Sequence, residues 1–368
     1  MEFKIQKTEF LKGLYPAQGI ADRKSTLPIL ANVLLRSDGK ERVLVAATDL
    51  TVGVSAELPC KVEKEGGLTL GAKHLFDIVK ALPGEELVLR RADNNWAEIK
   101  SGKAEYRLVG MADRDFPKLP NHREVTFAKL DAAILRDMVG KTIFSASTDE
   151  TRYHLNGVLF ECDGKRARMV STDGHRLSKV ERDFPGGPKL AQGVIIPRKA
   201  LAEVQRVLEG HDGPCEIGMH QGHLFTRVGA LALSAKLIDA QFPPYEAVIP
   251  KQHDKTVVLG RGALLDALRR ISIMASDRTF GIKLHVADGG LTITRDNPDL
   301  GEAKEEMDAD IKGGKLTVGF NARYLIDVIS NIDDEEVKLE LGGELDPGVV
   351  RPGSPKNEYL GVIMPMRI

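Results

Sequence analysis

The chain has 368 residues, enough for two or three domains, and its hydrophobic residues, at 42%, are sufficient to build their cores. Charged residues make up 29%, yet the formal net charge is only −1, so no strong overall field indicates a partner. There is no long apolar run that could span a membrane, Met1–Lys7 lacks the apolar core of a signal peptide, and three scattered cysteines cannot form a disulfide framework, so a reducing cytoplasm is the expected location.

Six segments of the chain are expected to form helices. In three of them apolar residues recur three and four positions apart, which places them on one face of a helix. Each of the other three helices precedes a group of strand-like segments. In these segments apolar and polar residues alternate, as in Val52–Ala56 and Ala104–Val109. The expected helices are, in chain order, Glu9–Ala21, Lys73–Leu82, Ala132–Ser147, Ala200–Leu208, Gly262–Ser276 and Tyr324–Ile332.

These features recur along the chain with a period of about 124 residues. The matching positions are Leu75, Leu201 and Leu325 in helices, Asp49, Asp173 and Asp296 near Thr-Asp pairs, Asn32 and Asn156 in apolar runs, and Phe116-Pro117 and Phe242-Pro243. A period this long is typical of repeated domains, because stacked solenoid repeats are much shorter. The sequence therefore predicts three similar domains, 1–121, 122–252 and 253–368, with borders in the Pro-rich or charged segments 117–123 and 250–255.

Each predicted domain combines two helices with mainly antiparallel strands, so the expected fold class is α+β. The segment Val170–Leu177 is its clearest local motif, because Asp173-Gly174 is a turn sequence between two strand-like runs and predicts a β-hairpin tip. His175 beside Asp173 could act as an acid/base pair in an enzyme. No nucleophile or orienting group accompanies it, so a histidine at a turn is the favoured interpretation.

Other enzyme signatures are absent. The sequence has no Walker A loop, no G-x-G-x-x-G after a strand, no H-E-x-x-H, no C-x-x-C and no G-x-S-x-G. His220 and His223 are three positions apart but flank a Gln-Gly hairpin turn, with no carboxylate or cysteine to complete a ligand set. We therefore expect no catalytic residue, no metal and no cofactor.

Charge is unevenly distributed along the chain. Asp299–Asp310 carries a local charge of −5, which alone favours a solvated face and leaves open an electrostatic interface with a basic strand such as Lys100–Arg107. Counted with their flanking residues, over 9–24, 72–82, 131–142, 197–209, 262–276 and 321–332, the helical segments sum to +4, whereas the whole chain is −1. This slight excess suits loose phosphate contact without sequence-specific binding.

Five motifs together closely resemble the bacterial DNA polymerase III β subunit family, the sliding clamps, and the resemblance spans the full length. The motifs are Thr26–Leu30 (TLPIL), Asn156–Glu161 (NGVLFE), Thr172–Leu177 (TDGHRL), Phe320–Val328 (FNARYLIDV) and Met364–Ile368 (MPMRI). The resemblance implies three clamp domains per chain and a head-to-tail homodimeric ring with six-domain pseudo-symmetry. Helices would line the hole and sheets would form the rim.

Such a ring implies a non-catalytic processivity factor that encircles double-stranded DNA without reading its sequence. Its partners would be the replicative DNA polymerase catalytic subunit, the clamp loader, other polymerases and repair proteins. Residues that match the family's DNA-contacting positions are Lys24, Arg152, Tyr153 and His154. A non-ring nucleic-acid binder is disfavoured, because its usual strongly basic patch is missing.

Two protein interfaces also follow from the resemblance. The head-to-tail contact would place Lys73, Lys100, Lys103 and Tyr106 of the first domain against Ile273, Met274, Glu302, Glu305 and Glu306 of the third, which reverses the preference for a solvated acidic run. A hydrophobic pocket for short partner peptides would contain Leu155, Thr172, Gly174, His175, Arg176, Leu177, Pro243, Val248, Asn321, Tyr324, Val362, Met364, Pro365 and Met366. The flexible methionines suit a site that accepts several peptides.

The sequence departs from the family pattern at three places. Glu246-Ala247 follows Phe-Pro-x-Tyr where a basic residue is common, His154 follows Tyr153 where a second tyrosine is common, and Gly342–Pro355 is rich in Gly and Pro. These departures affect one wall of the expected pocket, one expected DNA-contacting loop and one rim loop.

Overall fold

The computed structural model describes residues 1–122, 124–274, 280–287, 289–354 and 358–367. By internal packing the chain divides into two compact units. Unit 1 comprises Met1–Arg136, Gly186–Pro188 and Lys199–Leu237, and unit 2 comprises Asp137–Pro185, Lys189–Arg198 and Ile238–Ile368. None of the helices within the described ranges is long and apolar enough to cross a membrane.

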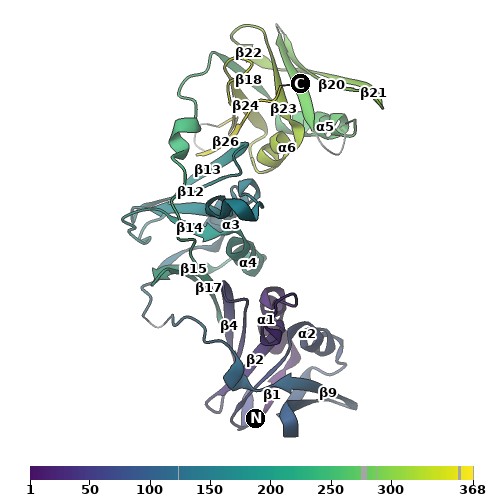
Figure 1. The fold of residues 1–368 in the computed structure, drawn as a ribbon, viewed down its shortest axis with the longest axis vertical. Coiled ribbons are helices and arrows are strands. Elements are labelled where there is room, and N and C mark those ends of the chain that lie inside the picture. The colour runs from purple at the N-terminus through teal and green to yellow at the C-terminus, as the bar shows by residue number, and fades with distance from the viewer. Residues whose placement is uncertain (123, 275–279, 288, 355–357, 368) are drawn as a thin grey trace. The chain divides into compact units, whose positions relative to one another are not determined.

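Unit 1 is built on a 13-stranded sheet with the strand order β10-β15-β16-β17-β4-β3-β2-β6-β9-β8-β7-β1-β5. Helices α1 (Lys7–Ile20) and α2 (Ala72–Ala81) pack against each other, and α1 also packs on β3 and β4 (Figure 1). Helix α4 (Arg198–Leu208) also lies in this unit from Lys199 onward. The strands are β1 (Glu2–Gln6), β2 (Asn32–Asp38), β3 (Arg42–Thr48), β4 (Val52–Pro59), β5 (Lys61–Lys64), β6 (Gly67–Gly71), β7 (Glu86–Arg91), β8 (Trp96–Ser101), β9 (Ala104–Met111), β10 (Ala128–Asp131), β15 (Pro214–His220), β16 (His223–Val228) and β17 (Leu231–Lys236).

Unit 2 contains a nine-stranded sheet, β14-β11-β12-β13-β26-β25-β24-β18-β22, and a four-stranded sheet, β21-β20-β19-β23. Helices α5 (Arg261–Ser272) and α6 (Ala322–Ser330) pack together, and α3 (Ala132–Gly140) spans the border of the two units. The strands are β11 (Gly157–Cys162), β12 (Arg166–Thr172), β13 (Arg176–Asp183), β14 (Val194–Pro197), β18 (Lys255–Gly260), β19 (Gly281–Ala287), β20 (Gly290–Asn297), β21 (Gly301–Asp308), β22 (Asp310–Lys312), β23 (Leu316–Asn321), β24 (Glu336–Leu341), β25 (Gly348–Pro352) and β26 (Tyr359–Ile363).

The element order confirms the threefold repeat. Each copy starts with a strand and a helix, continues with four or five strands, and ends with a second helix and three strands. The copies begin at β1, β10 and β18. The predicted α+β class with three similar copies is therefore confirmed, and all the strand pairs within the sheets are antiparallel among the described residues.

Two details of the sequence interpretation were wrong. Asp296, aligned with Asp49 and Asp173, lies inside β20, and the turn that follows is made by Asn297, whose Oδ1 accepts a 2.9 Å hydrogen bond from the Asp299 amide. The helix expected over Ala132–Ser147 is shorter, because α3 ends at Gly140. The last two residues of the helix expected over Gly262–Ser276 lie outside the described residues.

The two faces of the β13–β26 strand pair are covered differently. On one face the fully buried Tyr359 lies beneath α6, and Gly361 lets that helix approach, since a Cβ there would be 2.4 Å from Val328. On the other face Leu177 pairs with Val362, and a buried apolar cluster forms with Tyr245 from the connecting segment 238–249. The connecting segment therefore forms one wall of any pocket on this second face.

Candidate partner-binding site

The hairpin turn from Thr172 to Arg176 is fixed by its own side chains. The Thr172 hydroxyl donates to the Arg176 carbonyl (2.6 Å) and accepts from the Gly174 amide (3.1 Å). Oδ1 of Asp173 accepts from the amides of His175 (2.9 Å) and Arg176 (3.0 Å). Gly174 has φ +90°, a conformation that other residues adopt at a cost. The Thr-Asp-Gly sequence thus specifies the turn, as predicted.

Arg176 holds this turn to the rest of unit 2. Its guanidinium forms ion pairs with Asp173 (3.0 Å) and with Asp327 of α6 (2.5 Å), and donates to the Phe144 carbonyl (2.7 Å). It also lies 4.5 Å from the ring centroid of Tyr324. The side chains of Arg176 and Asp173 are 11% and 17% exposed, so their ion pair is largely shielded from solvent, whereas the Asp327 side chain is 42% exposed.

Beside the turn is an apolar pocket of about 290 Å³. Strands β13 and β26 form its floor through Leu177 and Val362, and the connecting segment with the 3-10 turn Tyr245–Val248 forms a wall. Its lining residues are Leu155, Thr172, Gly174, Arg176, Leu177, Pro243, Pro244, Tyr245, Ala247, Val248, Val362 and Met364. A hollow of this kind can hold one or two apolar side chains, with Arg176 and Thr172 as polar neighbours.

The structure brings most of the expected pocket residues together, but not all of them. Those that line the pocket are Leu155, Thr172, Gly174, Arg176, Leu177, Pro243, Val248, Val362 and Met364. His175 contacts one of these lining residues through its carbonyl, which accepts a hydrogen bond from the Met364 amide (2.9 Å). Asn321 caps α6 through the Arg323 amide, Tyr324 stacks on Arg176, and Met366 pairs with the Gly319 carbonyl, while Pro365 lies between the two methionines in sequence.

Two lining residues, Pro244 and Tyr245, were not expected in the pocket, and Ala247 was expected only as a departure in its wall. The repeated Phe-Pro pair just before them was the available signal, because it marks the segment that forms this wall. The Tyr245 hydroxyl is fixed between Glu161 (3.0 Å) and Arg168 (2.8 Å). Burial, and then the hydrogen bond to Glu161, raise the pKa of Tyr245 to about 12, so the phenol stays neutral and the wall stays in place.

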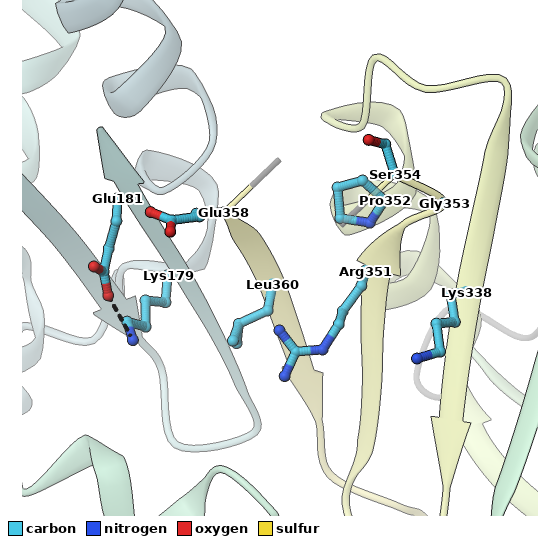
Figure 2. A pocket seen from close by; sticks show the side chains of 9 residues that line it. All are labelled: Lys179, Glu181, Lys338, Arg351, Pro352, Gly353, Ser354, Glu358 and Leu360. Atoms are coloured by element: carbon cyan, nitrogen blue, oxygen red, sulfur yellow. Dashed lines mark ion pairs between the residues drawn. The ribbon is translucent and has the colours of Figure 1, made fainter. Parts of the chain in front are cut away.

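A second hollow, of about 410 Å³, lies further along the same strand pair and is charged (Figure 2). Lys179 and Glu181 of β13 form an ion pair there (2.8 Å), and Arg351 and Lys338 both reach Glu340, at 2.9 and 2.6 Å. Burial opposes ionisation of Glu181 and Glu340, but hydrogen bonds from these cations hold the pKa of each carboxyl below its ordinary value. The charges therefore neutralise one another, and the apolar pocket is the better candidate for partner binding.

Models of all three domains of the DNA polymerase III β subunit match this chain. The N-terminal domain matches residues 1–120, the central domain 129–244 and the C-terminal domain 246–367. The chain belongs to this family, the bacterial sliding clamps.

Individual clamps from other bacteria are similar over their whole length. The beta sliding clamps of Pseudomonas putida and Escherichia coli K12 are 35% and 32% identical, with 100% of each chain covered. Among solved structures, the DNA polymerase III subunit beta of Pseudomonas aeruginosa has a TM-score of 0.94 at 33% identity, with 100% of both chains covered. A sliding clamp from Bartonella birtlesii bound to griselimycin has a TM-score of 0.94 at 34% identity, also with full coverage.

In this clamp, the residues expected at a subunit interface lie at strand edges and helix ends. Lys73 is on α2, and Lys100, Lys103 and Tyr106 lie on or between β8 and β9. In unit 2, Ile273 is 75% exposed just after α5, followed by Met274, and Glu302, Glu305 and Glu306 lie on β21. Glu305 is paired with Arg270 (2.6 Å) and Glu306 with Lys304, so part of the acidic strand is already neutralised within the chain.

The residues expected to contact DNA are exposed or half-buried. Lys24 is exposed after α1 in unit 1. Arg152, Tyr153 and His154 lie together in the turn Glu150–Leu155 of unit 2, where Arg152 pairs with Asp149 (3.7 Å) and the Tyr153 and His154 rings meet edge to face at 5.8 Å. Tyr153 is 58% exposed, which leaves its ring available to a ligand.

Within the described part of the chain, no three His, Cys, Asp or Glu side chains are grouped so that they could hold a metal ion. His220 and His223 flank the β15–β16 hairpin turn, as the Gln-Gly sequence predicted. His175 and Asp173 meet in the backbone turn, where the His175 amide donates to Oδ1 of Asp173.

Proposed function

We propose that this chain is the processivity factor of the bacterial replicative DNA polymerase. Two copies join head to tail, and their six domains, 1–121, 122–252 and 253–368 of each chain, form a ring around duplex DNA. The full-length match to the sliding-clamp family, together with the three repeated α+β copies, carries this proposal. The clamp acts without catalysis, in the cytoplasm where bacterial DNA is replicated.

A closed ring holds DNA by topology, so each phosphate contact can be weak. The helical segments counted from the sequence sum to +4 on a chain of net charge −1, which favours DNA without fixing it to one position. Lys24, Arg152, Tyr153 and His154 supply the proposed contacts outside the helices. Arg152 and Tyr153 lie on one short turn, which places a cation and an exposed ring side by side.

The strand edges support the proposed head-to-tail contact. Strand β21 is at the edge of its sheet, and β9 pairs with β6 only through Thr69–Leu70, so both have unpaired backbone groups. An exposed edge is a template for another strand. Joining β9 to β21 of the second copy would bring Lys100, Lys103 and Tyr106 close to the glutamates of β21, with Lys73, Ile273 and Met274 beside them.

The apolar pocket at Thr172–Arg176 is the proposed site for short hydrophobic segments of the polymerase, the clamp loader, other polymerases and repair proteins. Its fourteen proposed residues are the nine expected residues that line the pocket, Leu155, Thr172, Gly174, Arg176, Leu177, Pro243, Val248, Val362 and Met364, and the neighbouring His175, Asn321, Tyr324, Pro365 and Met366. Deleting Met364–Ile368 should abolish binding of a polymerase-derived peptide and leave a dimer of about 80 kDa. Unchanged peptide affinity after the deletion would refute this site.

DNA retention tests the ring. With its loader and ATP, the clamp should stay on nicked circular DNA during gel filtration at a salt concentration that removes loosely bound protein. Cutting the circle with a restriction enzyme should release it, because a ring slides off a free end. Equal retention on circular and linear DNA would contradict encirclement.

A further inference from the structure

Unit 1 contains a hollow that corresponds to the apolar pocket of unit 2 within the repeat. Its volume is about 460 Å³. It lies at the β3–β4 turn and at the β15–β16 turn, and the segment after Phe116 lines one side. The residues used below are Leu50, Lys118, Leu119, His220, His223 and Lys236.

The turn that lines this hollow has the same side-chain-to-backbone hydrogen bonds as the turn beside the apolar pocket. The Thr48 hydroxyl donates to the Val52 carbonyl (2.9 Å) and accepts from the Leu50 amide (3.0 Å). Oδ1 of Asp49 accepts from the amides of Thr51 (2.8 Å) and Val52 (2.7 Å). These are the same four bonds that fix Thr172–Arg176, so the two turns have equivalent geometry.

The neighbouring strand repeats as well. Strand β17 pairs antiparallel with β4, as β26 does with β13. The Lys236 amide then donates to the Thr51 carbonyl (2.8 Å), and the Met364 amide donates to the His175 carbonyl (2.9 Å). Lys236 therefore occupies the place that Met364 has in the apolar pocket, and Pro117, Lys118 and Leu119 occupy the places of Pro243, Pro244 and Tyr245.

The backbone at Leu50, which lines the hollow, is strained. Leu50 has φ +75°, where the equivalent Gly174 has φ +90°. A leucine in this left-handed region costs about 1–2 kcal/mol relative to a right-handed conformation. Leu50 is nevertheless 56% exposed, so no burial offsets the cost. Residues with backbone strain of this kind cluster at active sites, ligand clamps and switch regions.

The charged residues that line the hollow around Leu50 are two lysines, Lys118 and Lys236, and one carboxylate, Glu124. Lys118 and Lys236 are exposed, and neither ammonium makes an ion pair with any residue that the structure describes. His220 and His223 add two ring nitrogens, of which the His220 Nε2 lies 3.5 Å from Glu124. The apolar surface of Leu50 and Leu119 is therefore bordered by two lysines that pair with no described carboxylate, while Glu124 lies beside His220.

We propose that this hollow is a second peptide site, which binds a short partner segment with one or two apolar side chains flanked by Asp or Glu. The apolar anchor would lie between Leu50 and Leu119, and the flanking carboxylates would pair with Lys118 and Lys236. The site goes beyond the proposed function, because it lies on the other unit and selects for acidic segments. A partner that carries both kinds of segment would gain avidity from using both sites.

The test follows methyl NMR signals of the intact protein during titration with the peptide acetyl-EDLEFDE-amide. Leu119 reports on the second site and Met364 on the apolar pocket. We expect saturable shifts at Leu119, and binding weakened at least tenfold for the neutral peptide acetyl-QNLQFNQ-amide. Absence of shifts at Leu119, or equal binding of both peptides there, would overturn the proposal whatever Met364 shows. Absence of shifts at Met364 alone would count only against peptide binding at the apolar pocket.

Two variants sharpen the test. Leu50→Gly suits the observed backbone and should fold normally, yet weaken acidic-peptide binding at Leu119 at least fivefold. The double variant Lys118→Glu/Lys236→Glu should weaken it at least tenfold, whereas Lys40→Glu/Lys64→Glu, at exposed lysines outside the hollow, should not. Unchanged affinity in both test variants would overturn the proposal. Displacement of the peptide from Leu119 by oligo-dT would overturn it too, by assigning the hollow to nucleic acid.

Discussion

The turns Thr48–Val52 and Thr172–Arg176 have the same backbone hydrogen bonds and different side chains around them. One turn has Leu50 at its apex and Val52 after it, and the other has Gly174 and Arg176. Arg176 ties its turn to Asp327, whereas Val52 is simply buried. The repeat thus conserves the scaffold, and a few side chains decide what each hollow accepts.

Of the changes to these two turns, removal of Arg176 should have the largest effect on stability and peptide binding. Arg176→Ala removes two ion pairs and the hydrogen bond to the Phe144 carbonyl, and leaves Asp173 without its cation. We expect a loss of about 2–3 kcal/mol in the free energy of unfolding, and at least tenfold weaker binding of hydrophobic peptides at the apolar pocket. Urea unfolding and peptide titration measure the two effects. A loss below 0.5 kcal/mol would show that the contacts do not anchor the turn.

Exchanging the apex residues should have the next largest effect. Gly174→Leu places a leucine at φ +90°, with its Cβ 3.2 Å from Arg152, and should cost about 1–2 kcal/mol. It should also weaken peptide binding at the apolar pocket. Leu50→Gly is the matched exchange and should change stability by less than about 1 kcal/mol, since relief of strain offsets the greater freedom of glycine. Equal destabilisation by both variants would contradict the strained state of Leu50.

Replacing the turn threonines should show what the two sites share. Thr48→Val and Thr172→Val keep the side-chain shape but remove a donor and an acceptor from the same pair of bonds. Each should cost about 1–2 kcal/mol, measured by chemical unfolding. The two losses should agree within about 0.5 kcal/mol. A large difference between them would mean that the turns are not energetically equivalent.

Acid should have the smallest effect, and it acts on the charged hollow of unit 2. Hydrogen bonds from Lys179 and Arg168 outweigh burial and hold the pKa of Glu181 below its ordinary value. Glu181 therefore contributes stability above about pH 4.5 that is lost as the pH falls through its lowered pKa. Glu181→Gln should flatten the stability profile between pH 5 and 3 by about 1 kcal/mol or less. An unchanged acid profile in this variant would show that the ion pair is not linked to stability.

Much of the fold was predictable from the sequence, because it depends on local periodicity. Apolar spacing predicted the helices, and Asp173-Gly174 predicted its hairpin. The third Asp was misplaced because Thr294 and Asp296 imitate the Thr-Asp pair, while Asn297 makes the turn. The residue pattern alone does not show whether Asp296 or its neighbour Asn297 makes the turn.

The candidate site was less predictable. Its residues were expected from the resemblance to a family, not from spacing. The wall formed by Pro244, Tyr245 and Ala247 comes from an irregular segment, in which no period marks the residues that face inward. The hollow at Leu50 was not predicted, because a positive φ at leucine has no sequence signature.

Processive DNA synthesis tests the central claim most directly. On a primed circular template with excess competitor DNA, the polymerase and loader with this clamp should produce full-length products. A clamp with Met364→Ala and Val248→Ala in the apolar pocket should still be retained on nicked circles and yet yield only short products. Long products from that variant, at the wild-type level, would contradict the proposal that this pocket tethers the polymerase to the ring.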